Sequence, residues 1–144
     1  MKSKVLLIED DPLVAMMLEG YLDALGYEIT ASAASVSQSL ALVASEQYDF
    51  AILDVHLANG ETSEAVAMAL AAAGKAFMAT SGDATKMSPE YDGHPVLRKP
   101  FTIAALDQAI ALLSESKGAP DLHGGACLEL AENRIPISGM AGNT

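Results

Sequence analysis

The chain has 144 residues, 51% of them hydrophobic, which is enough to bury the core of one globular domain and too little for two. Nineteen acidic side chains against eight basic ones give a formal net charge of −11, so we expect no binding to nucleic acid or to an anionic membrane surface. The lone Cys127 excludes an internal disulfide, and the apolar run after Met1–Lys4 is too short for a signal peptide or a membrane span, which predicts a cytoplasmic protein.

The first predicted strand and helix follow directly from the N-terminus. Residues 4–8 form an apolar run typical of a buried strand. Asp11 can cap a helix and Pro12 suits its first turn, while Gly26 is a typical helix stop. Residues 27–33 then alternate weakly between apolar and polar side chains. This alternation predicts a second strand, with one inward face made of Tyr27, Ile29 and Ala31.

The middle of the chain continues this alternation of helix and strand. A serine-rich stretch opens a helix whose apolar stripe would be Val36, Leu40, Val43 and Ala44. The apolar run 50–53 predicts a third strand, which delivers Asp54 at its end. Residues 61–73 are rich in alanine and are followed by Gly74, so we expect a helix that packs closely on the sheet.

The next part of the chain holds two more predicted strands around an irregular segment. Residues 76–79 predict the fourth strand, and Thr80 and Ser81 follow it. The segment 82–94 has hardly any apolar periodicity, so at most a short helix is expected there. A short fifth strand over 95–98 precedes a last helix, which Thr102 would cap and whose inward residues would be Ile103, Leu106, Ile110 and Leu113.

Strands that alternate with helices predict a doubly wound α/β domain, with helices on both faces of a parallel sheet. We place this domain at residues 1–118, because the periodic pattern ends at the sequence Lys-Gly-Ala-Pro over 117–120. Residues 119–144 are rich in glycine and predict a flexible tail or a loose docking segment, in which residues 127–131 are able to form a turn of helix.

Chemically useful side chains follow four of the predicted strands, and a parallel sheet brings such strand ends to one edge. Glu9 and Asp10 follow the first strand, Asp54 ends the third, Ser81 follows the fourth and Lys99 the fifth. Three carboxylates together require a cation, and hard oxygen ligands suit Mg²⁺, while the amine of Lys99 adds a second positive charge. A carboxylate between two cations can attack a phosphoryl group, and the Ser81 hydroxyl would then hydrogen-bond the new phosphate.

The same residues carry a resemblance to a known family. The pair Glu9–Asp10, the strand-ending Asp54, the pair Ser81–Gly82 and the run Lys99–Phe101 resemble, in their order, the receiver domain of two-component response regulators. The resemblance covers about residues 4–117 and is greatest to the stand-alone, chemotaxis-regulator-like receivers of alphaproteobacteria. It implies a flavodoxin-like fold of five strand–helix units, with the parallel strands in the order 2-1-3-4-5.

The resemblance also implies roles for the acidic residues. Asp54 would be the phosphoacceptor for a histidine kinase or a histidine phosphotransfer protein. Asp10 and Asp54 would bind Mg²⁺ directly, with the backbone carbonyl of His56 as a third ligand and Glu9 acting through water. The only catalysis expected is transfer of the phosphoryl group to Asp54 and its hydrolysis from there, so we do not expect an enzyme that acts on other substrates.

The region from Ser81 to Lys99 matches the family's pattern at some positions and departs from it at others. Ser81 and Lys99 would contact the phosphate, and the Lys99–Pro100 peptide bond would be cis. Val96 stands where the family has an aromatic switch residue, and it has no ring to rotate. The segment between Ser81 and Lys99 is also short, so the helix that the family places fourth is expected to be short or remodelled.

The resulting prediction is a bacterial, phosphorylation-dependent signalling protein of a two-component system or phosphorelay. It would work in the cytoplasm by contact with a downstream protein target, without nucleic acid or membrane, and a homodimer is compatible with this interpretation. The alternative is a phosphate shuttle or sink in a multistep phosphorelay, with no surface output. A switch changes its binding to a partner when it is phosphorylated, whereas a shuttle returns the phosphoryl group to a histidine.

Overall fold

The computed structural model describes residues 2–45, 47–82, 87–116 and 128–130, which contain one six-stranded sheet in the order β2-β1-β3-β4-β5-β6. Every neighbouring pair of strands is parallel, and the first five strands have the predicted order. The strands are β1 (Lys4–Ile8), β2 (Glu28–Ala33), β3 (Phe50–Asp54), β4 (Ala76–Ser81), β5 (Pro95–Arg98) and β6 (Leu128–Leu130).

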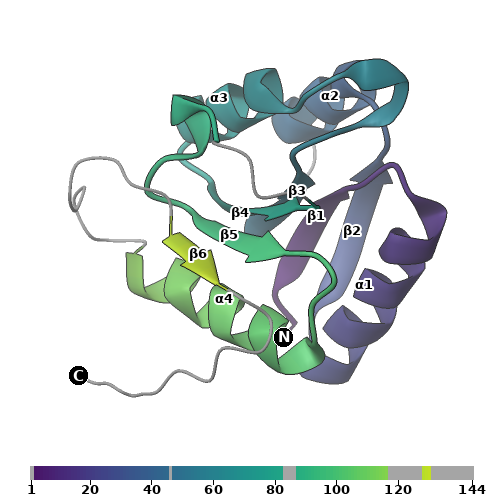
Figure 1. Cartoon of the computed structure of the whole chain (residues 1–144), viewed down its shortest axis with the longest axis vertical. Coiled ribbons are helices and arrows are strands. Elements are labelled where there is room, and N and C mark those ends of the chain that lie inside the picture. The colour runs from purple at the N-terminus through teal and green to yellow at the C-terminus, as the bar shows by residue number, and fades with distance from the viewer. Residues whose placement is uncertain (1, 46, 83–86, 117–127, 131–144) are drawn as a thin grey trace.

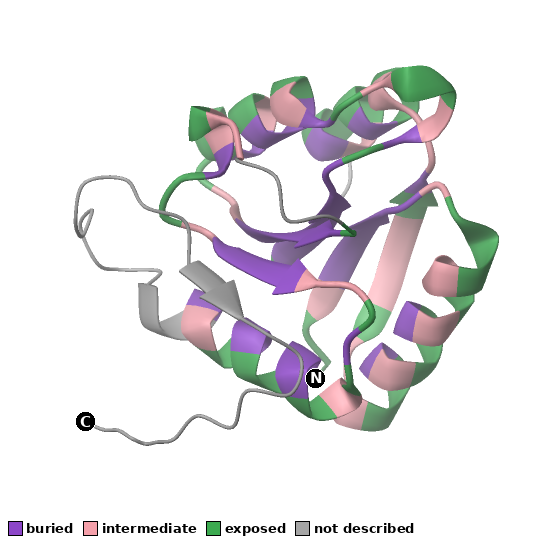
Figure 2. Cartoon of the chain, in the orientation of Figure 1, coloured by how far each residue is buried: buried purple, intermediate pink, exposed green. Residues whose placement is uncertain are grey.

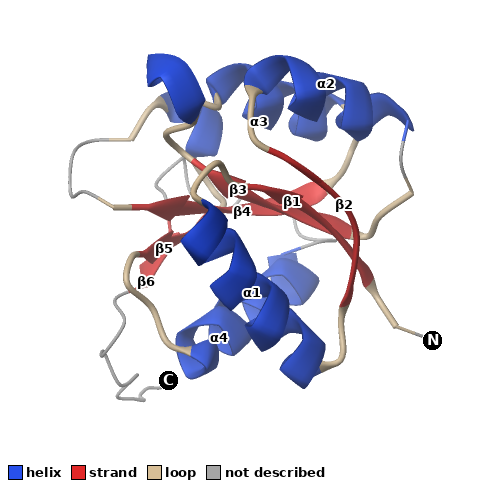
Figure 3. Cartoon of the chain, turned by 90° about the vertical axis from the view of Figure 1, so that its right-hand side faces the viewer, coloured by secondary structure: helices blue, strands red, loops and turns tan. Residues whose placement is uncertain are grey.

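Helices cover both faces of this sheet, as a doubly wound fold requires (Figures 1 and 3). They are α1 (Pro12–Leu25), α2 (Val36–Ser45), α3 (Glu64–Ala72) and α4 (Ile103–Ser116), with two 3-10 turns, η1 (Ala58–Gly60) and η2 (Pro89–Tyr91). Helices α1 and α4 lie on one face, and α2 and α3 on the other. In the described part of the chain, η2 is the only helical element between β4 and β5, so the predicted remodelling of the family's fourth helix is confirmed. No helix within these residues is long and apolar enough to cross a bilayer.

Local signals in the sequence place the helix ends. The Asp11 carboxylate accepts a hydrogen bond of 2.9 Å from the backbone N–H of Leu13, and Gly26 ends α1 in the left-handed region with φ of 91°. The Thr102 hydroxyl accepts a hydrogen bond of 3.1 Å from the backbone N–H of Ala105 at the start of α4. These caps confirm both predicted ends of α1 and the predicted start of α4, because each satisfies backbone groups that the first or last turn leaves without a partner.

The sheet separates two hydrophobic cores, and its central strands are buried (Figure 2). Strand β3 is buried over its whole length, from Phe50 to Asp54. A strand covered on both faces is a near-continuous apolar run, which is why the sequence signal was clear here. The same strand therefore carries Asp54 from the core to the carboxyl edge of the sheet, where the chain turns into a loop.

Two predictions about inward faces are wrong, each for a local reason. The register of β1 with β2 shifts between Val5 and Leu6, so Ile29 packs on the α1–α4 side and Ala31 on the α2–α3 side. An extra residue in a strand reverses the alternation of its side chains. In α2, Ser39 is buried and Leu40 is 38% exposed. The Ser39 hydroxyl donates a 2.6 Å hydrogen bond to the backbone carbonyl of Ser35 one turn earlier, so a polar residue can face the sheet.

Helix α3 begins at Glu64, three residues later than the alanine-rich run suggested. The preceding residues take part in the loop instead. The backbone N–H of Leu57 donates to the carbonyl of Glu61, and the Glu61 carboxylate accepts a 3.0 Å hydrogen bond from the backbone N–H of Val36 in α2. Tertiary contacts thus override the helix propensity of this stretch.

The sixth strand of the sheet, which lies in the predicted tail, differs from the prediction. Leu128–Leu130 forms β6 beside β5, where Pro95 pairs with Leu128 and Leu97 with Leu130, instead of a turn of helix (Figure 1). The predicted boundary at residue 118 and the rest of the predicted tail lie outside the described residues.

Candidate functional site

Three carboxylates meet at the carboxyl edge of the sheet. Strands β1 and β3 are neighbours, with Ile8 opposite Leu53, so the next residues Glu9 and Asp54 lie side by side. One oxygen each from Glu9, Asp10 and Asp54 lies within 4.8 Å of the others. Glu9 and Asp54 are buried, and Asp10 is half-buried. The predicted convergence of these residues is therefore found in the structure.

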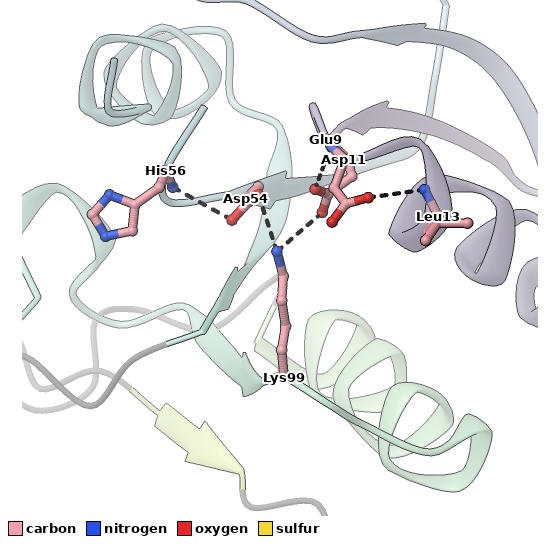
Figure 4. A network of polar contacts seen from close by, with 6 residues as sticks. All are labelled: Glu9, Asp11, Leu13, Asp54, His56 and Lys99. Carbon is pink, nitrogen blue, oxygen red and sulfur yellow. Dashed lines mark hydrogen bonds and ion pairs between the residues drawn. The ribbon is translucent and has the colours of Figure 1, made fainter. Parts of the chain in front are cut away.

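Lys99 reaches this cluster from the end of β5 and lies between two of the carboxylates (Figure 4). Its ammonium nitrogen Nζ is 3.0 Å from Asp54 Oδ2 and 3.3 Å from Glu9 Oε1. The backbone N–H of Lys99 also donates a 2.8 Å hydrogen bond to the carbonyl of Ser81 at the end of β4. The Lys99–Pro100 peptide bond is cis, as the resemblance implied.

Burial and neighbouring charges change the pKa values of Glu9 and Lys99. Burial, followed by the charge of Asp54, raises the pKa of Glu9 to about 7, although the backbone N–H of Asp11 and the ammonium of Lys99 act in the opposite direction. Burial alone would lower the pKa of Lys99, but the carboxylates of Asp54 and Glu9 together outweigh it and raise that pKa. Lys99 therefore stays charged, while Glu9 changes its charge near neutral pH.

This raised pKa predicts a pH dependence of stability in the absence of divalent metal. The folded chain holds the Glu9 proton more tightly than the unfolded chain, whose pKa is near 4.5. The resulting stability is fully present below pH 4.5 and is lost as the pH rises to about 7, an effect on the order of 3 kcal/mol. Urea unfolding between pH 4.5 and 8 measures it, with Glu9→Gln as the control. Wild type should lose stability relative to Glu9→Gln as pH rises, and a constant difference would contradict the prediction.

Two hydroxyl residues lie where β4 ends. Thr80 is opposite Asp54 in the register of β3 and β4, and its carbonyl accepts a 3.0 Å hydrogen bond from the backbone N–H of Val55. Ser81 follows, opposite Arg98 of β5, and both hydroxyl residues are buried. The structure therefore brings the predicted Ser81 to the edge of the sheet, and its contact with a phosphate stays a prediction.

His56 is placed beside Asp54 through its backbone and not through its ring. Its backbone N–H donates a long, 3.4 Å hydrogen bond to Asp54 Oδ1, while the imidazole is exposed and points away from the cluster (Figure 4). This agrees with a role for the backbone of His56, and the metal contact of its carbonyl stays a prediction.

The chemistry of the donors fits a hard divalent cation. Three carboxylates from two adjacent strand ends supply only oxygen, which suits Mg²⁺. The buried Glu9 Oε1 accepts no hydrogen bond from the described residues, and its only cationic neighbour there is Lys99. With only the Lys99 ammonium at 3.3 Å beside it, this oxygen fits a further cation, or a water bound to one, as a partner.

Sequence reasoning did not foresee two contacts at this site. The strand-end rule places Glu9 and Lys99 at one edge of the sheet, but the direct 3.3 Å ion pair between these residues, 90 positions apart, appears only in the structure. The second is a buried hydrogen bond of 2.8 Å between the hydroxyls of Ser63 and Tyr91. The only sign of this hydrogen bond in the sequence is the presence of an aromatic residue, Tyr91, in the irregular segment 82–94.

Comparisons with known proteins agree with this geometry. The response regulator receiver domain, as a sequence family, matches residues 5–111. The solution structure of SdrG from Sphingomonas melonis Fr1 is 38% identical, with a TM-score of 0.72, and the match covers 78% of this chain and 97% of SdrG. The BeF3-activated conformation of SdrG from Pseudomonas melonis Fr1 is 40% identical, with a TM-score of 0.67 and coverage of 76% and 94%. The PhyR receiver domain of Erythrobacter litoralis, at 24% identity, TM-score 0.69 and coverage of 85% and 97%, shares the fold. A search of curated protein sequences found no match.

Proposed function

The chain belongs to the response regulator receiver family, and from this membership we propose that Asp54 accepts a phosphoryl group and that the phosphorylated chain signals through protein contact. The observation that carries the proposal is the position of Asp54 at the end of a fully buried strand, 3.0 Å from the Lys99 ammonium and within a cluster of three carboxylates. The phosphoryl donor would be a phosphohistidine of a histidine kinase or of a histidine phosphotransfer protein.

In the proposed reaction, a carboxylate oxygen of Asp54 forms a bond to phosphorus and the bond between phosphorus and the donor's imidazole nitrogen breaks. The imidazole leaves with its electron pair and takes up a proton. Mg²⁺, held by Asp10, Asp54 and the carbonyl of His56 with Glu9 acting through water, would neutralise charge on the phosphoryl oxygens. The Lys99 ammonium, which pairs with Asp54 in the unphosphorylated chain, would then pair with an oxygen of the phosphoryl group.

The partners in this proposal are proteins at both steps. A histidine kinase or phosphotransfer protein supplies the phosphoryl group, and a downstream protein reads the phosphorylated surface in the cytoplasm. The net charge of −11 argues against nucleic acid and anionic membranes as targets, because both would be repelled. Ser81 would hydrogen-bond the new phosphate from the end of β4, next to the strand that carries Lys99.

Incubation with acetyl phosphate and Mg²⁺, followed by intact mass, tests the proposal. The expected result is a gain of one phosphoryl group, about 80 Da, that disappears when EDTA removes the metal. No gain with acetyl phosphate or with phosphoramidate would overturn it. Back-transfer to a histidine phosphotransfer protein without any change in partner binding would instead identify a phosphate shuttle.

A further inference from the structure

A tyrosine is buried in the short segment that precedes β5. Residues 87–94 contain only the 3-10 turn η2, yet the Tyr91 side chain at the end of this turn is fully buried. It packs in the same core cluster as Val96, the residue that stands where the family has an aromatic switch. The cluster therefore contains an aromatic side chain from the segment before β5, whereas β5 itself supplies Val96.

The Tyr91 hydroxyl connects this segment to the loop that follows Asp54. It lies 2.8 Å from the hydroxyl of Ser63, and both side chains are fully buried. The backbone N–H of Ser63 in turn donates a 3.0 Å hydrogen bond to the carbonyl of Val55, the residue directly after Asp54. A chain of two hydrogen bonds thus leads from Tyr91 to the residue next to the phosphoacceptor.

A second polar contact joins the same two parts of the fold. The Ser88 hydroxyl donates a hydrogen bond to the carboxylate of Glu64, the first residue of α3. The turn η2 lies against α3 (Figure 1). Movement of the loop after Asp54, or of the start of α3, would therefore displace residues 88–91 through these two contacts.

Burial and nearby charges also act on the Tyr91 phenol, and the charge of Asp54 is one of them. Burial raises the pKa of Tyr91 to about 12, and the charges of Glu64, Glu90 and Asp54 add to this, so the phenol stays protonated. Ser63 and Tyr91 each carry one O–H group, and only one of these two groups donates in the hydrogen bond between them. The other O–H remains a donor in a buried region where a new negative charge attracts it strongly.

We propose that Tyr91, through its hydrogen bond with Ser63, couples the phosphorylation state of Asp54 to the position of residues 87–94. The proposal rests on the proposed function. A phosphoryl group adds about 1.5 to 2 negative charges and three acceptor oxygens at Asp54. The O–H donors of Ser63 and Tyr91 reorient toward this charge, and the turn carrying Tyr91 shifts with them. Tyr91 is thus a positioning residue, and residues 87–94 are the surface that reports phosphorylation.

The test compares hydrogen exchange of residues 87–94 in the full chain before and after phosphorylation with acetyl phosphate and Mg²⁺. In wild type we expect phosphorylation to change the opening equilibrium of this segment by roughly 5- to 150-fold, the usual size of such a coupling. Tyr91→Phe removes only the hydroxyl. We expect it to gain the same mass as wild type, while the phosphorylation-dependent change in exchange falls toward onefold.

Tyr48→Phe is the matched control, because Tyr48 is also a buried tyrosine and its hydroxyl donates a 3.1 Å hydrogen bond to the carbonyl of Val43. It loses one buried hydrogen bond in the same core cluster, so it should lower stability but keep the phosphorylation-dependent change. Ser63→Ala breaks the contact from the other side and should match Tyr91→Phe, and the double variant should add nothing further.

A full phosphorylation-dependent change in either Tyr91→Phe or Ser63→Ala would overturn the coupling, whatever the loss of stability. Loss of the change in Tyr48→Phe as well would also overturn it, because a general loosening of the core would then explain the result. Wild-type phosphorylation is measured first by mass, so a failure of the proposed function is seen separately from a failure of this coupling.

Discussion

The Asp54→Ala protein is expected to gain no phosphoryl group from acetyl phosphate under conditions that fully modify wild type. The other carboxylates of the cluster are poor substitutes. Glu9 is buried and is engaged by the backbone N–H of Asp11 at 3.1 Å and by Lys99 at 3.3 Å. Removal of Asp54 also removes a charge that now raises the pKa of Glu9, so Glu9 should be more fully ionised at neutral pH and should pair with Lys99 alone.

Intact mass with and without Mg²⁺ measures this effect, and Asp11→Ala provides the matched control. The Asp11 carboxylate caps α1 by accepting a hydrogen bond from the Leu13 N–H (Figure 4), and it is not part of the cluster of Glu9, Asp10 and Asp54. Its loss should cost about 1 kcal/mol of stability but leave phosphorylation intact. Full modification of the Asp54→Ala protein would show that another residue is the acceptor and would contradict the assignment.

Lys99→Ala is expected to have the second-largest effect, on stability and on signalling. Without the ammonium, the buried carboxylates of Glu9 and Asp54 have no cationic partner among the described residues of the metal-free protein. Removal of one partner from a buried ion pair costs about 3–5 kcal/mol, and the partial exposure of Lys99 places the expected loss near the lower end. Because Glu9 is protonated at low pH, the loss should be larger at pH 8 than at pH 5.

Urea unfolding without metal at these two pH values measures the loss, and Mg²⁺ should reduce it by supplying the missing positive charge. Lys75→Ala is the control, since the Lys75 ammonium donates a 2.9 Å hydrogen bond to the carbonyl of Tyr48 and lies over the Tyr48 ring. Its smaller loss should not depend on pH in this range. An equal loss for Lys99→Ala at pH 5 and pH 8 would contradict the electrostatic explanation.

The same variant separates phosphorylation from its consequences. Asp54 remains the nucleophile in Lys99→Ala, so acetyl phosphate with Mg²⁺ should still add a phosphoryl group, at a lower rate. A phosphorylation-dependent change in the exchange of β5, residues 95–98, should be lost, because Lys99 is no longer there to contact the phosphate. The change at residues 87–94 should remain, because it depends on Tyr91 and Ser63. Loss of the change at residues 87–94 as well would show that the coupling through Tyr91 and Ser63 needs Lys99.

The sequence alone predicted the first five strands, most helix limits and the residues that meet in the candidate site. These features depend on neighbouring residues: an apolar run for β3, the Asp11 carboxylate within reach of the Leu13 N–H, and a glycine after α1. The rule that parallel strands end at one edge then predicts that Glu9, Asp54 and Lys99 lie together. Local chemistry and one topological rule therefore sufficed for the candidate site.

Only the tertiary structure decided the contacts that join distant segments. The shift between Val5 and Leu6 moves Ala31 to the other face, and no periodicity in the sequence marks it. Tyr91 is buried in the same core cluster as residues of α3 and β4, and its hydroxyl finds a partner in Ser63. Such contacts depend on which side chains the packed sheet and helices bring within hydrogen-bonding distance, and residues 28 positions apart carry no signal of this in their own neighbourhoods.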